Sequence, residues 1–199
     1  ESERVGKSLA LGIVTLDSFM SMSSMGFGPQ GYYNFKMGDY WSTHNNAKDL
    51  FPHPSWQTLQ MRNEHCSGKM MKVAYEKVKT IDIPTKEVYK TNNDGSRKAV
   101  KVAGRKGISL LMCYAFKNGE KQSIILFNRS FNEQRTAELR FPSKPSRNVT
   151  LHKLTHSDPR ATNRKVYQVK PVTEKRNDFK DGYRIEVPPS SLIILTTPQ

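Results

Sequence analysis

The chain has 199 residues, of which 36% are hydrophobic, and its 32 lysines and arginines against 18 aspartates and glutamates give a net charge of +14. A chain of this size and apolar content can bury a core, which excludes a disordered protein, and the charge favours anionic partners. The basic residues are spread from Lys69 to Lys180 without a run of five or six, which argues against a dedicated nucleic-acid site.

No stretch reaches about eighteen consecutive apolar residues, so we expect no membrane span. The first residues, Glu1 to Arg4, lack the charged-then-apolar order of a signal peptide and lead directly into an amphipathic pattern, as though the chain continued from an upstream segment. The two cysteines, Cys66 and Cys113, are too few for a disulfide framework, and Cys113 is expected to be a small core residue.

The first predicted element is a helix from Ser2 to about Met25, with Ser2 as its N-cap. Apolar side chains at three- and four-residue steps give this helix one buried face, and they include Leu9, Ile13 and Leu16. The glycine-rich residues 26–31 end the helix.

A short strand at 32–35 is followed by a loop at 36–46 that is rich in aromatic, amide and hydroxyl groups. That mixture suits sugar recognition, because a ring stacks on a sugar face while amides and hydroxyls bind its hydroxyl groups. Ser55 is then expected to cap a second helix from Trp56 to about Cys66. A strand flanked by two helices cannot bury its faces alone, so residues 1–70 need neighbours that are either absent from the chain or supplied by its later strands. The obvious candidate for such a piece is the end of a (β/α)8 barrel.

Residues 71–199 show short β-like runs separated by turns, which predicts an antiparallel β-sandwich and a mainly β protein overall. The strongest signal is the apolar hairpin at 108–130, whose central Asn118-Gly119 predicts a type I′ turn. Strands are expected at 70–76, 78–83, 86–90, 98–103, 108–117, 121–128, 134–141, 147–154, 165–173, 183–187 and 191–197.

No complete catalytic or cofactor-binding motif is present, and no cofactor is expected. His44 and His53 flank the segment after the aromatic loop, but they lie on no single predictable face, so we expect no metal site. Two triplets fit the N-glycosylation pattern, at Asn128 and Asn148, and they matter only in a eukaryotic secreted protein.

The order of elements resembles the C-terminal part of retaining glycoside hydrolases similar to the α-L-arabinofuranosidases. The residues that carry the resemblance are the Pro-His-Pro-Ser-Trp helix start at 52–56, Asn128-Arg-Ser130, the stretch 155–163 and the final Pro-Pro-Ser-Ser-Leu-Ile-Ile-Leu at 188–195. The resemblance implies a hydrolase of O-glycosyl bonds, a carbohydrate partner, and a secreted or periplasmic protein.

In that family two carboxylates about 5–5.5 Å apart perform the reaction, and the resemblance places both upstream of Glu1, so no catalytic residue is assigned here and enzymatic activity of these 199 residues stays open. It also assigns four residues to the wall of the sugar site, which are Tyr40, Trp41, His44 and Asn45. The alternative for Tyr40 and Trp41 is that they pack between barrel and sandwich.

Without the rest of a barrel, the apolar face of the first helix would meet water, so we expect the chain to self-associate or to bind an upstream barrel polypeptide. A rival interpretation from another class is a non-catalytic module whose basic sandwich binds acidic glycan or nucleic acid. Salt dependence separates the two, because binding through stacked rings is nearly independent of salt whereas contacts to anionic groups weaken as salt rises.

Overall fold

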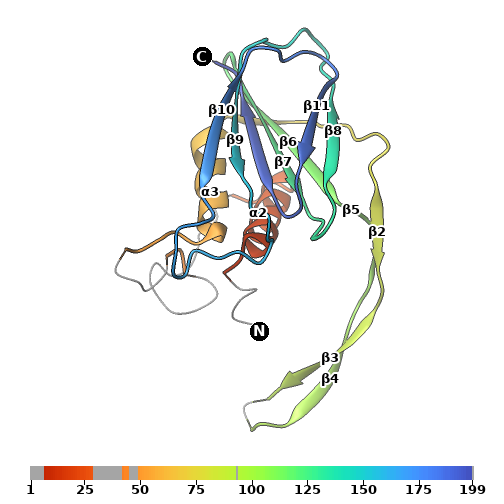
Figure 1. Cartoon of the computed structure of the whole chain (residues 1–199). Coiled ribbons are helices and arrows are strands. Elements are labelled where there is room, and N and C mark those ends of the chain that lie inside the picture. The colour runs from red at the N-terminus through yellow and green to blue at the C-terminus, as the bar shows by residue number, and fades with distance from the viewer. Residues whose placement is uncertain (1–6, 29–41, 45–48, 93, 199) are drawn as a thin grey trace. The chain divides into compact units, whose positions relative to one another are not determined.

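The computed structural model describes residues 7–28, 42–44, 49–92 and 94–198. Two helices and twelve strands form in this part of the chain, and every strand pair is antiparallel, which confirms the mainly β prediction (Figure 1). The chain forms two compact units. The larger unit combines residues 1–74 with residues 111–199, and residues 75–110 form the second unit, called the arm below. The expected boundary between residues 70 and 71 stays a prediction.

The helices are α2 (Leu9–Ser24) and α3 (Pro54–His65). The predicted N-cap of the first helix, Ser2, lies outside the described residues, and the helix begins later, where the Ser8 hydroxyl accepts a hydrogen bond from the Leu11 amide at 3.3 Å. The prediction that Ser55 caps the second helix is wrong, because Pro54 already occupies the first turn, where its missing N–H costs nothing.

A glycine lets the two helices approach closely. A Cβ atom on Gly12 would lie 3.0 Å from the backbone of Pro54, a separation too tight for most side chains. Thr58 then donates a hydrogen bond from its hydroxyl to the Gly12 carbonyl at 3.1 Å. The start of α3 is thereby fixed against the first turn of α2.

The larger unit is built on a six-stranded sheet with the order β1-β6-β7-β12-β9-β10, and β8 and β11 pair in a second, two-stranded sheet. The bounds of these eight strands are β1 (Lys69–Met71), β6 (Leu111–Asn118), β7 (Lys121–Asn128), β8 (Arg135–Leu139), β9 (Val149–Leu154), β10 (Pro171–Arg176), β11 (Tyr183–Val187) and β12 (Leu192–Thr196).

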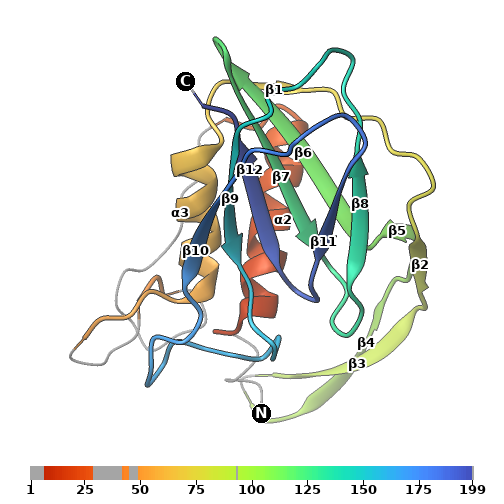
Figure 2. The same ribbon diagram turned by 45° about the horizontal axis from the view of Figure 1, so that its top comes forward.

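Alternation along the central strands separates two cores. On β7, Ile125 and Phe127 pack with the helices, whereas Ile124 and Leu126 pack with β8 and β11. Figure 2 shows this order of layers, with the helices on one face of the large sheet and the β8–β11 pair on the other. The sandwich of the prediction is therefore present, with a helical layer added to it.

The apolar face of α2 is covered by this sheet. Leu9, Ile13 and Leu16 are 0%, 2% and 0% exposed, and they share one core with strands β6, β7 and β12. The expectation that these three side chains would meet water without the rest of a barrel is wrong, because the chain's own sheet buries them. Because these side chains are buried, they give no reason to expect self-association.

Three strand predictions need correction. The run at 70–76 is a strand only as far as Met71, where β1 ends, and residues 72–76 form no strand. The run at 165–173 is not a strand along its first six residues, and the edge strand β10 begins only at Pro171. The run at 108–117 is divided at Leu110 into β5 and β6, which belong to different units.

The turn of the central hairpin also differs from the prediction. Asn118 pairs with Lys121, so the two central residues are Gly119 and Glu120, and of these only Gly119 has a positive φ, at 58°. A type I′ turn needs positive φ at both positions, whereas type II′ needs it only at the first, where glycine is favoured. The hairpin therefore has the type II′ pattern.

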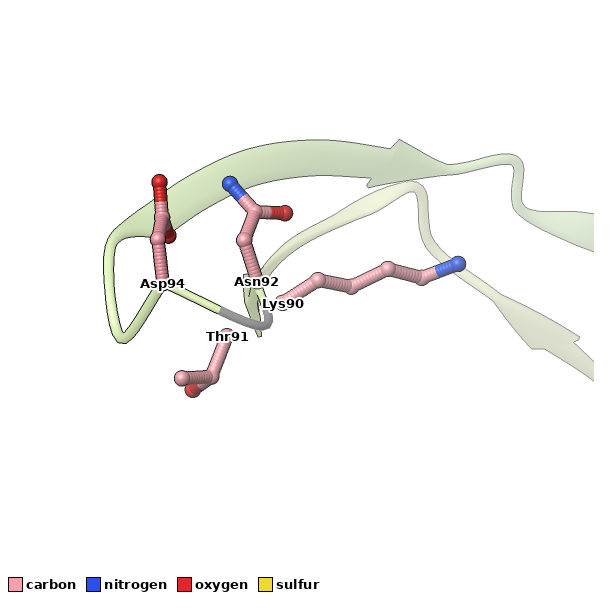
Figure 3. A pocket seen from close by; sticks show the side chains of 4 residues that line it. All are labelled: Lys90, Thr91, Asn92 and Asp94. Carbon is pink, nitrogen blue, oxygen red and sulfur yellow. The ribbon is translucent and has the colours of Figure 1, made fainter.

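The arm is a ribbon of four short strands, β2 (Thr80–Ile83), β3 (Lys86–Thr91), β4 (Arg97–Val102) and β5 (Arg105–Ser109). β2 pairs with β5 and β3 with β4. Between the two strand pairs, the two segments of the arm come very close to each other, since a Cβ atom on Gly104 would lie 2.4 Å from the Ile83 carbonyl oxygen. At the tip, Asn92 and Asp94 are joined to Ser96 by hydrogen bonds of 2.9 and 2.6 Å. Figure 3 shows the side chains of Asn92 and Asp94 at this tip.

Candidate functional site

Of the four residues assigned to a sugar site, the structure describes His44, and Tyr40, Trp41 and Asn45 lie outside the described residues. His44 forms an isolated β-bridge with Pro52, and its Nδ1 lies 2.8 Å from the Thr43 hydroxyl oxygen. Burial lowers the pKa of the half-buried His44 imidazole, which favours its neutral form. His44 can therefore act as a hydrogen-bonding group without carrying charge near neutral pH.

His53 lies in the same region and is fully buried. Its backbone amide donates a hydrogen bond to the Thr43 carbonyl at 2.8 Å, and neither ring nitrogen has a hydrogen-bond partner in the described structure. Burial lowers the pKa of His53 to about 4, and nearby basic groups add to the effect, namely Lys7, His44 and Arg164. A neutral imidazole with two unused nitrogen atoms is therefore held directly behind the His44 segment.

The Asn163 side chain connects the segment before α3 to the sandwich. Its side-chain amide is fully buried and donates hydrogen bonds to the Pro52 carbonyl at 2.9 Å, the Val169 carbonyl at 2.9 Å and Gln57 Oε1 at 3.2 Å. Its Oδ1 atom accepts hydrogen bonds from the Gln168 and Val169 amides at 3.2 and 2.8 Å. One buried side chain thus joins the segment before α3, α3 itself and the loop that leads into β10.

Aromatic contacts support the same junction. The rings of Phe51 and Tyr167 stack with their centroids 5.6 Å apart, and Tyr167 accepts a hydrogen bond from Gln57 Nε2 at 2.9 Å. Lys170 places its ammonium group 5.1 Å from the centre of the Tyr167 ring. The groups that meet here are imidazoles, amides and aromatic rings, which suit recognition of a hydroxylated ligand.

The sequence pointed to His44 through the composition of its loop, but it did not identify His53 or Asn163 as site residues. His53 had a signal, because a histidine between two prolines immediately before a helix has its backbone position fixed. Asn163 ends the stretch 155–163 that carries the family resemblance, but nothing in the sequence marked it as a site residue, because its role comes from burial and from partners far away in the sequence.

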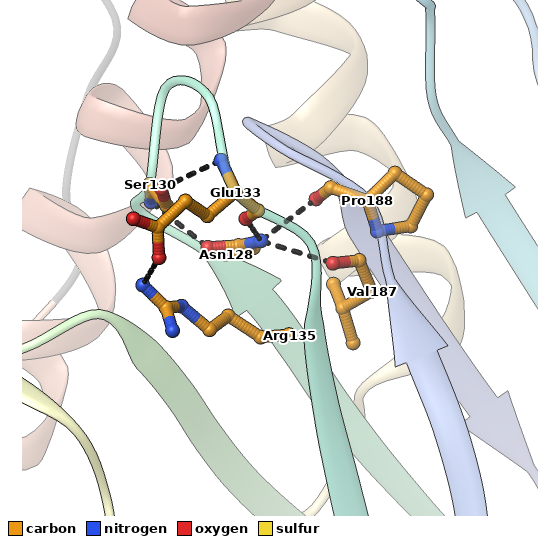
Figure 4. Close-up of polar contacts among 6 residues, drawn as sticks. All are labelled: Asn128, Ser130, Glu133, Arg135, Val187 and Pro188. Atoms are coloured by element: carbon orange, nitrogen blue, oxygen red, sulfur yellow. Dashed lines mark hydrogen bonds and ion pairs between the residues drawn. The ribbon is translucent and has the colours of Figure 1, made fainter.

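The glycosylation triplet at Asn128 has a structural role. The Asn128 side chain is 0% exposed; its Nδ2 donates hydrogen bonds to the carbonyls of Glu133, Val187 and Pro188 at 2.8, 2.9 and 3.1 Å, and its Oδ1 accepts one from the Ser130 amide at 2.8 Å. Figure 4 shows this amide at the centre of the junction between the loop after β7 and the end of β11. A glycan could not be attached without breaking these bonds.

Neither cysteine has the properties of a nucleophile. Burial raises the pKa of the Cys66 thiol to about 11 and that of the Cys113 thiol to about 12, so both stay protonated near neutral pH. Within the described ranges, no three histidine, cysteine or acidic side chains come together in a way that could bind a metal ion. No helix in the described part of the chain is long and apolar enough to cross a bilayer.

No protein-family model and no curated protein matches the chain. Solved structures do match it. An α-L-arabinofuranosidase from Thermotoga maritima, in complex with arabinose, has a TM-score of 0.75 and 16% identity over 96% of this chain and 38% of its own. A family 51 enzyme of the same name from Thermotoga petrophila has a TM-score of 0.70 and 16% identity over 94% and 38%. Another from Bifidobacterium longum has a TM-score of 0.64 and 9% identity over 96% and 34%.

This chain shares the fold of part of a family 51 α-L-arabinofuranosidase. The match confirms the resemblance seen in the sequence at the level of fold, and it is consistent with a C-terminal part. The chain spans less than two fifths of the length of these enzymes. Because the identities are 16% or lower, the likeness shows the fold alone.

Proposed function

We propose that this chain is the C-terminal segment of a carbohydrate-active glycoside hydrolase of the α-L-arabinofuranosidase type. In this proposal residues 1–70 form the end of the catalytic barrel, the sandwich supports it, and the loop at 40–45 lines the sugar site. The observation that carries the proposal is that one structural match covers 96% of the chain, and thus both the helices and the sandwich.

The contacts of Asn163 support the assigned role of the sandwich. They fix Pro52, which bridges to His44, to the loop before β10. A sugar-binding loop must be held within a fraction of an ångström of its working geometry, and buried hydrogen bonds from a rigid layer provide that. The sandwich would therefore position one wall of the site while taking no part in the reaction.

The reaction itself would use groups from elsewhere. Retaining hydrolysis needs a carboxylate nucleophile and a carboxylic acid about 5–5.5 Å apart. The proposal places both in the upstream barrel, so we expect the 199 residues alone to show no turnover of aryl arabinofuranosides. An active preparation of this chain would contradict that placement.

The chain has two tryptophans, Trp41 in the candidate loop and Trp56 in α3, and this allows a direct test of the sugar site. Trp56→Ala leaves Trp41 as the only tryptophan, and Trp41→Ala leaves Trp56 as the only one. We expect added L-arabinose or an arabino-oligosaccharide to change the emission of the variant that keeps Trp41 and not that of the variant that keeps Trp56.

His44→Ala, made in the variant that keeps Trp41, should weaken the fluorescence response while leaving the melting temperature nearly unchanged, because the ring is only half buried. A saturating sugar that leaves Trp41 emission unchanged in the folded protein would rule out the loop as a sugar site. If Trp41→Ala instead unfolds the chain, Trp41 packs between layers.

A further inference from the structure

The arm, residues 75–110, concentrates positive charge on a ribbon that is exposed along most of its length. It carries nine lysines and arginines against four acidic residues. β3 is exposed at every position, and β4 at every position except Val100. A two-stranded ribbon buries little of its own surface, so the sequence of these strands is free to serve a purpose other than packing.

The register of β3 and β4 assigns each side chain to one of two faces. Directly opposed residues project to the same side, and successive pairs alternate. One face therefore carries every second pair, which are Lys86 with Val102, Val88 with Val100 and Lys90 with Lys98. We call this the basic face of the arm.

The basic face contains no acidic residue. Glu87 pairs with Lys101 and so projects to the opposite side. Asp94 accepts hydrogen bonds from Ser96, and Asp82 accepts one from the Gly107 amide at 2.8 Å. In the described structure Lys86, Lys90 and Lys98 form no ion pair.

Lys90 and Lys98 stand directly opposite each other. Like charges in that position destabilise a strand pair, whereas an opposite-charge pair would stabilise it. The cost is removed when an anion binds between the two ammonium groups. Lys86, four residues from Lys90 on the same strand, places a further positive charge about 13 Å along the ribbon, because each strand residue advances about 3.3 Å.

We propose that the basic face of the arm binds a linear polyanionic glycan, a chain that carries uronate carboxylates along its length. The lysines are spread along the ribbon, which suits a polymer, and Val88 and Val100 between them offer an aliphatic surface to the C–H faces of sugar rings. The basic face has no aromatic side chain on which a base could stack, since the exposed Tyr89 projects to the other side. The choice of a glycan over nucleic acid also rests on the function proposed above.

The test compares two variants with the same loss of charge. In the arm variant Lys86, Lys90 and Lys98 are replaced by glutamine. In the control, glutamine replaces three exposed lysines of the other unit that form no ion pair in the described structure, namely Lys144, Lys165 and Lys180. Binding is measured at low salt with polygalacturonate, with neutral debranched arabinan and with a single-stranded DNA oligonucleotide.

We expect the arm variant, which loses three exposed ion pairs with the glycan, to bind polygalacturonate about 3-fold to 100-fold more weakly than the unchanged chain and to show a smaller salt dependence. The control should change little. Amide hydrogen exchange should slow in β3 and β4 when polygalacturonate is added.

Lys98→Glu provides an independent check. It places opposite charges across the ribbon, so it should keep the arm folded while it weakens polygalacturonate binding. Equal losses in the arm variant and the control would overturn the proposal in favour of net charge alone, and no binding by the unchanged chain would also overturn it. Tighter binding to the DNA would assign the face to nucleic acid. The tryptophan response to arabinose reports separately on the sugar loop, so a failure of either proposal can be recognised by itself.

Discussion

His53 is the least satisfied polar side chain near the candidate sugar loop. Its ring is fully buried, and in the described structure neither nitrogen atom has a hydrogen-bond partner. A buried donor and acceptor without partners cost free energy, so a residue of this kind in a stable core needs a reason. Its position behind His44, to which Thr43 links it through a backbone hydrogen bond, connects that reason to the loop.

The buried His53 should make the protein sensitive to mild acid. Its pKa is about 4 in the folded chain and about 6.5 when unfolded, so between these values the unfolded state binds more protons. Stability is therefore fully present above pH 6.5 and falls as the pH is lowered toward 4. Between pH 8 and pH 5 the His53 contribution to the free energy of unfolding should decrease by about 2 kcal/mol.

Urea denaturation at pH 8 and pH 5 measures this effect when the unchanged chain is compared with His53→Leu. His152, whose pKa is also lowered to about 4, mainly by burial, remains in both proteins and cancels in the comparison. The variant should lose about 2 kcal/mol less than the unchanged chain between the two pH values. Equal losses in the two proteins would mean that His53 takes up protons while folded.

At the scale of elements, the turn of the central hairpin depends on one glycine. Gly119 has a φ of 58°, whereas Asn118 has ordinary strand geometry and a contact of 3.2 Å with the Ser67 hydroxyl. A side chain at a position with left-handed φ costs about 1–2 kcal/mol. Gly119→Ala should therefore lower the free energy of unfolding by about that amount, and Asn118→Ala by a few tenths.

Thermal unfolding of the two single variants provides the measurement. Asn118→Ala is the matched control for Gly119→Ala, because both residues are exposed at the same turn. If Asn118→Ala proved the more harmful of the two, the hairpin would have the type I′ turn that the sequence alone indicated.

Local sequence patterns predicted the strands well where the apolar residues of the pattern are the ones that the fold buries. The alternation at 183–187 corresponds to β11 residue for residue, and the apolar run at 121–128 corresponds to β7. The run at 165–173 is predicted as a strand as well, yet its first part is a loop, because the Asn163 side chain accepts the hydrogen bonds of the Gln168 and Val169 amides that a strand partner would otherwise accept. Sequence spacing alone does not reveal such a competitor.

The candidate site was predictable to a smaller degree than the fold. The composition of the loop drew attention to His44, and the resemblance to a family gave it a role. The anchoring of that loop by Asn163 and the burial of His53 depend on which segments meet in space, and these contacts join residues more than a hundred positions apart. The packing of residues 1–70 against the sandwich was implied by the resemblance, and the core that the helices share with the large sheet agrees with it.

At the scale of the whole molecule, the helices and the large sheet share one core. The sheet face toward the helices contains Ile125, Phe127, Leu154, Leu192 and Ile194, and all five are fully buried. Burying such a side chain contributes about 1.5–3 kcal/mol, so exposing five would cost on the order of 10 kcal/mol. That is comparable to the entire stability of a typical domain, about 5–15 kcal/mol.

We therefore predict that residues 71–199, expressed without the helices, do not form a stable monomer, whereas removal of the arm is tolerated. Residues 75–110 form a compact unit of their own, so a glycine-rich linker replaces them in the arm-deleted chain. Light scattering and thermal unfolding of the two shortened chains test this prediction. The arm-deleted chain should remain a monomer with a melting temperature close to that of the unchanged chain, and the helix-deleted chain should aggregate or bind hydrophobic dyes. Cooperative unfolding of a monomeric 71–199 chain would instead establish the sandwich as an independent domain with its boundary at residue 70.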